Sequence, residues 1–143
     1  MRYVAALLFG LGLLVCGCSS RDEVLRLTSP DGRVDALLFE KDCGAPCSFG
    51  YEVRLATKGS RHGEEVASLV GASRNDNAWG VNLKWSGADE LSVEYLRAED
   101  ARLLKQTVGI AGHNVKVSLR GGIKDPLAPA GGMLYNLQGR PRD

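Results

Sequence analysis

The chain has 143 residues, with 18 basic and 17 acidic side chains and a formal net charge of +1. This length suits a single domain that buries its own hydrophobic core. No segment concentrates lysine and arginine among aromatic residues, which argues against a nucleic-acid-binding protein and against a polybasic membrane patch.

The first residues have the pattern of a secretory signal peptide. Arg2 precedes an apolar run from Tyr3 to Val15, and this run is shorter than the roughly 20 residues that a membrane-spanning helix needs. We therefore predict that residues 1–17 are cleaved. Their removal from 143 residues leaves 126, with 17 basic and 17 acidic side chains.

The segment from Leu14 to Cys18 reads LVCGC and resembles a bacterial lipobox. In such a motif an aliphatic residue and a small residue precede the cysteine whose thiol takes a diacylglyceryl group. Gly17 before Cys18 suits the lipoprotein signal peptidase, whereas Val15 before Cys16 does not. The resemblance therefore implies lipidation of Cys18 and loss of Cys16 with the signal peptide.

A lipid on Cys18 would place the protein at a membrane. Two or more acyl chains anchor a protein stably, and residues 18–23 form the predicted lipidated cysteine and tether. Ser19 and Ser20 follow Cys18, where lipoproteins retained in the inner membrane typically have aspartate. By this sorting rule the resemblance implies the periplasmic face of the outer membrane, if the host has one.

From residue 24 the chain alternates apolar and polar side chains. Tyr51, Val53 and Leu55, for example, alternate with Glu52 and Arg54. This period of two is typical of antiparallel sheets with one buried and one solvated face. Seven strands are predicted, at 24–29, 33–41, 49–57, 64–70, 80–86, 90–97 and 113–120.

The connections between these strands suit hairpins. The segment 29–32 reads SPDG, in which proline sets the first central φ of a type I turn and glycine closes the turn. The segment 86–89 reads SGAD and joins two strands through a short loop. We therefore predict a mainly β domain over 24–120, an antiparallel meander that forms a sandwich or a small open barrel.

Two segments depart from this pattern. Between 98 and 108, an acidic start followed by leucines favours one short helix near 99–107 over an irregular strand. The tail 121–143 is rich in glycine and proline, and only Met133 to Leu137 could dock as an edge strand or a recognition segment. Simple packing or disorder is favoured for this tail.

The N-terminal half carries one family resemblance. The SPDG turn, the segment VDALLFEKDCGA at 34–45 and the segment WSGADELSVEY at 85–95 resemble a family of small uncharacterised bacterial proteins, many of them lipoproteins. The resemblance covers residues 28–96. It implies an envelope location and no particular activity.

Cys43 and Cys47 are the remaining cysteines of the predicted mature chain. Beyond the cytoplasmic membrane the compartment is oxidising, so an intramolecular disulfide is favoured. The alternatives are free thiols and a thiol-redox or soft-metal site, because Cys-x3-Cys with a distant histidine resembles copper-delivery proteins of the thioredoxin-like kind. Those folds follow the motif with a helix, whereas 49–57 has the pattern of a strand.

The sequence contains none of the common motifs for serine hydrolases, zinc peptidases or phosphate-binding loops. His62 lies in a polar loop and His113 at a strand start, where a solvated loop residue and a hairpin-turn residue are favoured over catalytic roles. Asp35, Glu40 and Asp42 lie along one hairpin, and ordinary surface charge is favoured over a site. We therefore predict no catalytic residue, no metal ligand and no cofactor.

The tryptophans suggest one contact residue. Trp85 and Tyr95 share the inward phase of their strands and are predicted to lie in the core. Trp79 stands beside Asn77 and Gly80 in a predicted loop, so it is the exposed candidate for contact with a partner.

These features favour a non-catalytic envelope lipoprotein that binds another envelope protein or a wall component. One alternative is a thiol-redox or metal-binding protein that uses Cys43 and Cys47. Another is a binder like the periplasmic lysozyme inhibitors, whose size and compartment fit but whose motifs are not found in this chain. The predicted contacts are the membrane, through lipid on Cys18, and an envelope partner, with no nucleic acid and no small-molecule cofactor.

Overall fold

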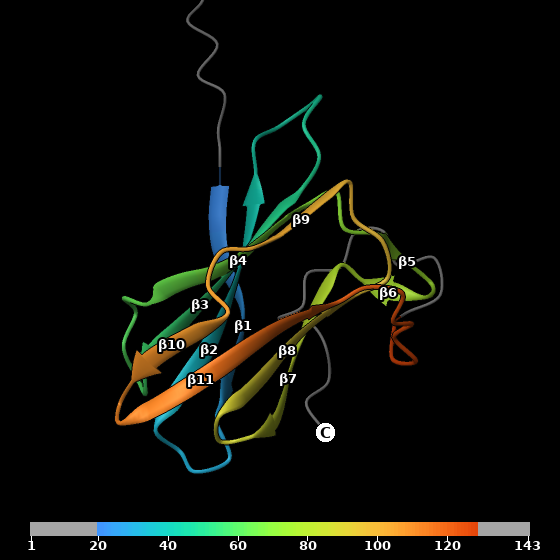
Figure 1. Ribbon diagram of the computed structural model, residues 1–143. Helices are drawn as coiled ribbons and strands as arrows, with labels where there is room; N and C mark the ends of the chain where they lie inside the picture. Colours follow the sequence, from blue (N-terminus) through green and yellow to red (C-terminus); the bar gives the residue numbers. More distant parts are fainter. Residues whose placement is uncertain (1–19, 129–143) are drawn as a thin grey trace, which may run out of the picture.

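A computed structural model describes residues 20–128, and every regular element in this range is a β-strand (Figure 1). The predicted signal peptide, Cys18 and the segment Met133 to Leu137 lie outside these residues. Within the described range no helix is long and apolar enough to cross a membrane. The strands are β1 (Ser20–Thr28), β2 (Val34–Asp42), β3 (Gly50–Thr57), β4 (Glu64–Val70), β5 (Arg74–Asn75), β6 (Ala78–Trp79), β7 (Val81–Gly87), β8 (Glu90–Tyr95), β9 (Asp100–Leu103), β10 (Thr107–Ile110) and β11 (His113–Arg120).

The strands form two main sheets that pack face to face, with the small sheet in front of the large one in Figure 1. The large sheet has the order β1-β2-β3-β4-β9 and the small sheet the order β10-β11-β8-β7, while β5 and β6 form a separate hairpin. All pairs are antiparallel except β8 with β11. The prediction of a mainly β, antiparallel sandwich is confirmed.

The parallel pair results from a crossover that a simple meander does not contain. After β8 the chain adds β9 to the large sheet, returns to the small sheet as β10, and then places β11 beside β8. In this pair Val117 lies opposite Leu91 and Leu119 opposite Val93. The apolar side chains of both strands therefore face the core together.

The helix predicted near 99–107 is wrong. Asp100 to Leu103 form β9, which pairs with the edge of β4, and the carbonyl of Val66 accepts hydrogen bonds from the backbone N–H groups of Leu104 and Lys105. An isolated helix of about two turns is marginal in water, whereas the edge of β4 offers a row of backbone donors and acceptors. Pairing with that edge decides the conformation of this segment.

The domain begins earlier than the predicted residue 24. Residues 20–23, predicted as part of a tether, form the first half of β1 and pair with β2, from Ser20 opposite Asp42 to Glu23 opposite Phe39. These residues are polar or charged, so they lack the apolar alternation on which the prediction depended. Backbone pairing with β2 makes them part of the sheet.

The domain also extends beyond residue 120. Gly122 and Ile123 donate backbone hydrogen bonds to carbonyls at the end of β8 and just after it. Asp125 is buried and accepts a hydrogen bond of 2.8 Å from the side chain of Asn82 in β7. Residues 121–128, predicted as the start of a loose tail, are therefore packed on the sandwich.

The core lies between the two main sheets. Trp85 and Tyr95, predicted as core residues, pack against it while they stay partly exposed, and Trp85 Nε1 donates a 3.1 Å hydrogen bond to the carbonyl of Leu27. That bond joins β7 to β1, which are the edge strands on one side of the sandwich. The fully buried side chains come from both sheets and include Val24, Leu38, Tyr51, Val53, Leu55, Leu69, Val81, Leu91, Val93 and Val115.

Gly80 holds the β5–β6 hairpin against this core. Its φ is 104°, and a Cβ at this position would collide with the buried hydroxyl end of Tyr51. We expect Gly80→Ala to lower the free energy of unfolding by about 1–3 kcal/mol in chemical denaturation. Gly87→Ala is the control, because a Cβ there meets open space. Equal stabilities of the two variants would contradict this explanation.

Candidate functional site

The Cys43–Cys47 loop joins β2 to β3 at the end of the sandwich where β1 begins (Figure 1). The two sulfur atoms lie at disulfide-bonding distance, and the Cα atoms are 5.8 Å apart. Ser20 pairs with Asp42, so this loop lies beside the first residue of β1. The predicted cysteine pair is confirmed.

Loss of this disulfide should weaken the domain without changing its fold. Closure of so short a ring restricts the unfolded chain by about 2 kcal/mol, and both cysteines are exposed at the loop tip. We expect Cys43→Ser combined with Cys47→Ser to lower the free energy of unfolding by about 2 kcal/mol. Thiol counting on folded wild-type protein purified without reductant provides the check, since two titratable thiols would contradict the pairing.

His113, at the start of β11, contacts the β1–β2 and β7–β8 turns, and these two turns lie with the β10–β11 turn at the opposite end of the sandwich (Figure 1). Its Nδ1 lies 2.6 Å from Asp89 Oδ1 in the β7–β8 turn, and its Nε2 lies 2.8 Å from Asp31 Oδ2 in the β1–β2 turn. A hydrogen bond from Ser29 lowers the pKa of the Asp31 carboxyl, and the charge of His113 lowers it further. Because Ser29 is buried, this group offers no exposed nucleophile and serves to join the two sheets.

His62 lies in the exposed β3–β4 loop, as predicted, and its backbone N–H bonds to the side chain of Ser60. The three carboxylates along the β2 hairpin do not converge. Asp35 pairs with Arg26, and Asp42 accepts a hydrogen bond from its own loop. Glu40 lies 3.4 Å from Arg74. Across residues 20–128 no group of three His, Cys, Asp or Glu side chains is arranged to hold a metal ion.

The prediction that Trp79 is exposed is wrong. Trp79 forms part of β6 and is only 4% exposed, within the main hydrophobic cluster. The short β5–β6 hairpin turns it inward, because the neighbouring Gly80 allows the backbone to approach the buried Tyr51. Trp79 therefore stabilises the core and is not available to a partner.

Glu52 lies on the outer face of the large sheet, buried beneath three basic side chains. Arg21 and Lys41 contact its carboxylate at 2.6 and 2.5 Å, and Arg54 contacts it from the same strand. Burial alone would raise the pKa of Glu52, but hydrogen bonds and charges from Lys41 and Arg54 outweigh burial and lower it. With three positive charges around one carboxylate, this group keeps an excess of two positive charges.

Asp35 forms a second buried centre on the same face. It accepts hydrogen bonds from Arg26 at 2.8 Å, from Thr28 at 2.7 Å and from the backbone N–H of Gly59 at 2.8 Å. Burial would raise the pKa of Asp35, but the bonds from Gly59, Thr28 and Arg26 outweigh it and lower the pKa. The β3–β4 loop is thereby held over the sheet, because Arg26 also bonds to the carbonyl of Ser60.

The lowered pKa values of Asp35 and Glu52 make stability depend on pH. Their ordinary values are 3.8 and 4.5, so their stabilisation is fully present above about pH 5 and is lost as the pH falls through the lower folded values. We expect the urea midpoint to fall steeply below about pH 4 and to respond little to these two groups between pH 5 and 7. A midpoint unchanged down to pH 3 would contradict the ion pairs.

A cleft of about 610 Å³ opens on this outer face beside the Glu52 group. The ring of Phe39 lines it, with the guanidinium carbon of Arg21 4.3 Å from the ring centroid and that of Arg54 at 6.0 Å. Gly59 and Arg61 of the β3–β4 loop form another part of its wall. The cleft therefore combines an aromatic surface with several guanidinium groups.

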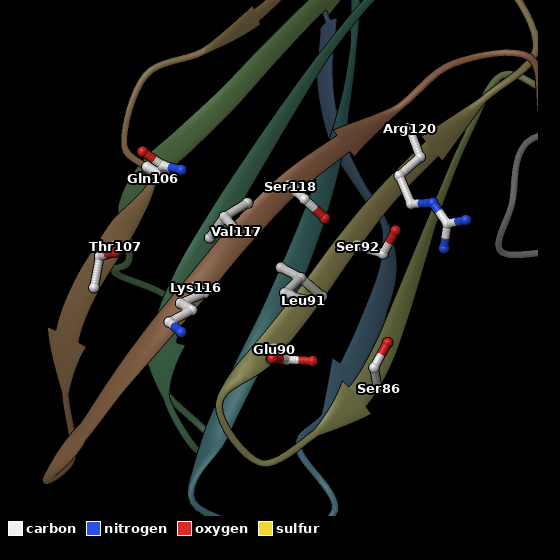
Figure 2. Close-up of a pocket in the computed structure, with 10 residues that line it drawn as sticks. All are labelled: Ser86, Glu90, Leu91, Ser92, Gln106, Thr107, Lys116, Val117, Ser118 and Arg120. Atoms are coloured by element: carbon white, nitrogen blue, oxygen red, sulfur yellow. The ribbon is translucent and has the colours of Figure 1, made fainter.

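A second depression of about 650 Å³ lies on the outer face of the small sheet (Figure 2). Ser86, Ser92 and Ser118 supply small side chains from three adjacent strands, and Lys116 and Arg120 extend from β11 beside them. None of its lining residues is aromatic. This polar groove suits a ligand that is recognised by hydrogen bonds and charge.

Sequence reasoning missed both depressions. Their residues are the outward members of the alternating strands, and the pattern that predicts the strands treats these members only as solvated. The register places Arg21 opposite Lys41 and Phe39 opposite Glu52. Leu37 and Phe39 on the polar side of their strand were the available signal, because both break the alternation there.

Comparisons with protein families, with curated proteins and with solved structures gave no match.

Proposed function

We propose that this protein is a lipoprotein of the bacterial envelope, anchored through Cys18, whose β-sandwich binds another envelope component without catalysis. The observation that carries the proposal is the position of the LVCGC motif directly before the folded domain. β1 begins at Ser20, two residues after Cys18. The motif therefore stands where a lipid anchor would join a folded domain.

The anchor would hold the sandwich close to the membrane. Two residues of extended chain span only about 7 Å, so the start of β1 would lie close to the lipid. In a host with an outer membrane, the serine after Cys18 supports the periplasmic face of that membrane as the location.

The polar groove in Figure 2 is the surface that best suits an envelope partner. It lies on the broad outer face of the small sheet, and its serines leave room for a ligand to approach the strands. A partner protein or a wall component that presents hydroxyl, amide and charged groups would match this lining. Its position on a side of the sandwich leaves it accessible while Cys18 is anchored.

Site-specific photo-crosslinking in the native host tests this surface. A photoreactive residue in place of Ser118, at the floor of the groove, is expected to capture a discrete envelope component. The same residue in place of Arg97, which is exposed outside the groove, is the matched control. Identical adducts from both positions, or an adduct from Arg97 alone, would contradict binding through the groove.

A further inference from the structure

The outer face of the large sheet carries a second group of features that the groove does not use. Around the Phe39 cleft lie five basic side chains, Arg21, Arg26, Lys41, Arg54 and Arg61, and three acidic ones, Glu23, Asp35 and Glu52. The five positive and three negative charges leave an excess of two. Glu65, opposite Arg54 in β4, reduces the excess on this face to one positive charge.

The acidic side chains here fix the positions of the basic ones. Glu23 binds Arg26 through both carboxylate oxygens, at 2.7 and 2.9 Å, so the charges of this pair cancel. Glu52 holds Arg21 and Lys41 while 42% and 47% of their side chains stay exposed. Arg61 is exposed and forms no ion pair within the described part of the chain. Arg21, Lys41 and Arg61 therefore present hydrogen-bond donors outward.

This arrangement suits a phosphate group. A guanidinium can donate two parallel hydrogen bonds to phosphate oxygens, and Arg21 uses one terminal nitrogen for Glu52. Its stacking on Phe39 at 4.3 Å restricts its orientation, so less conformational entropy is lost when a ligand binds. The cleft between Phe39 and Arg61 gives room for the atoms attached to the phosphate.

We propose that the Phe39 cleft binds the phosphate of an anionic phospholipid headgroup in the membrane that holds the protein. The choice of a lipid rests on the proposed anchoring at Cys18. Arg21 is the second residue of β1 and follows that cysteine by three residues, so the anchor would hold it near the membrane surface. A headgroup is thus the phosphate source nearest to the cleft. Binding would turn the outer face of the large sheet toward the bilayer and leave the groove of the small sheet accessible.

Vesicle binding by an unlipidated protein tests this proposal separately from the anchor. All strands of the described structure lie between Ser20 and Arg120, so a chain of residues 18–143 with Cys18→Ser keeps the whole sandwich. We expect it to co-sediment with phosphatidylglycerol vesicles at low ionic strength, to bind phosphatidylcholine vesicles at least tenfold more weakly, and to be released by salt.

Two pairs of substitutions of equal charge separate the cleft from general electrostatics. Arg21→Gln with Arg61→Gln is expected to weaken binding to phosphatidylglycerol vesicles at least tenfold, and Lys41 and Arg54 still neutralise Glu52 in this variant. Lys84→Gln with Lys124→Gln, exposed residues outside both the cleft and the groove, is expected to retain binding within about twofold. Near-ultraviolet circular dichroism checks that both variants are folded. If one variant does not fold, the lipid preference and salt dependence of wild-type binding still test the proposal.

Three results would overturn the proposal. The first is equal binding of the wild type to anionic and zwitterionic vesicles, and the second is an equal loss in the two double variants. The third is saturable binding of inorganic phosphate that depends on Arg21 and Arg61 without vesicle binding, which would assign the cleft to a free phosphate. If the vesicle experiment fails but lipid is found on Cys18, the cleft proposal is wrong and the proposed anchor stands. If vesicles are bound but Cys18 carries no lipid, the proposed anchor is wrong and the cleft still binds phospholipid.

Discussion

Cys18→Ala is expected to abolish lipidation and leave the full-length precursor in the cell. Without the thiol no diacylglyceryl group can be added, and the lipoprotein signal peptidase cleaves only the lipidated form. All strands of the described residues lie between Ser20 and Arg120, so the sandwich is expected to fold in this variant. Labelled-palmitate incorporation and gel mobility in the host measure the effect, and the expected loss of label is complete.

Cys16→Ala is the matched control for this experiment, because Cys16 lies two residues away in the same motif. It is expected to keep the label and the mobility of the wild type. Label that survives Cys18→Ala and disappears with Cys16→Ala would assign the lipid to the other cysteine. Label in neither the wild type nor the variants would remove the anchor altogether.

Asp35→Ala is expected to destabilise the domain by about 3 kcal/mol or more. Asp35 is 2% exposed, and its loss removes the acceptor of hydrogen bonds from Arg26, Thr28 and Gly59. Hydrogen bonds to a charged group contribute about 1.5–3 kcal/mol each, and the exposed donors of Thr28 and Gly59 recover part of this by bonding to water. Glu23 still pairs with Arg26 and offsets part of this cost.

Urea denaturation at pH 7 measures this change, with Asp100→Ala as the control. Asp100 also pairs with an arginine, Arg102 at 2.7 Å, but both side chains are well exposed. Exposed ion pairs contribute little, so the control should stay within about 1 kcal/mol of the wild type. If Asp35→Ala behaves like Asp100→Ala, the buried network does not hold the β3–β4 loop as described.

The strands that could be predicted are those whose inward side chains enter the core. The alternation of Tyr51, Val53 and Leu55 in β3 reflects burial between two sheets, and the structure confirms it. A local pattern carries no information about which strands become neighbours. The parallel pairing of β8 with β11 and the position of β9 on the large sheet therefore could not be read from it.

Trp79 and the first residues of β1 were predicted wrongly because their positions depend on tertiary contacts that a local pattern does not contain. Trp79 lies between residues typical of turns, so its burial depends on a two-residue hairpin folding inward, which only the tertiary structure determines. Residues 20–23 form a strand because β2 is available to pair with them, although their side chains carry no apolar pattern. A pattern of side chains therefore misses strands that form only because a neighbouring strand offers backbone hydrogen bonds.

The two candidate binding surfaces were hidden for a related reason. Outward side chains such as Arg21 and Lys41 are ordinary for a solvated sheet face, and only the register brings them together on Glu52. The Cys43–Cys47 pair was accessible to prediction because four residues of sequence separation already keep the two thiols close. Groups of side chains that long-range strand pairing brings together could be identified only from the structure.

The central claim, that this domain is held at the membrane by lipid on Cys18, is tested most directly by mass spectrometry of the protein purified from membranes of its native host. The account predicts an N-terminal peptide that begins at Cys18 and carries the mass of a diacylglyceryl group, with or without a further acyl chain. An unmodified N-terminal peptide, whether it begins at Met1 or at a residue after Cys18, would contradict it.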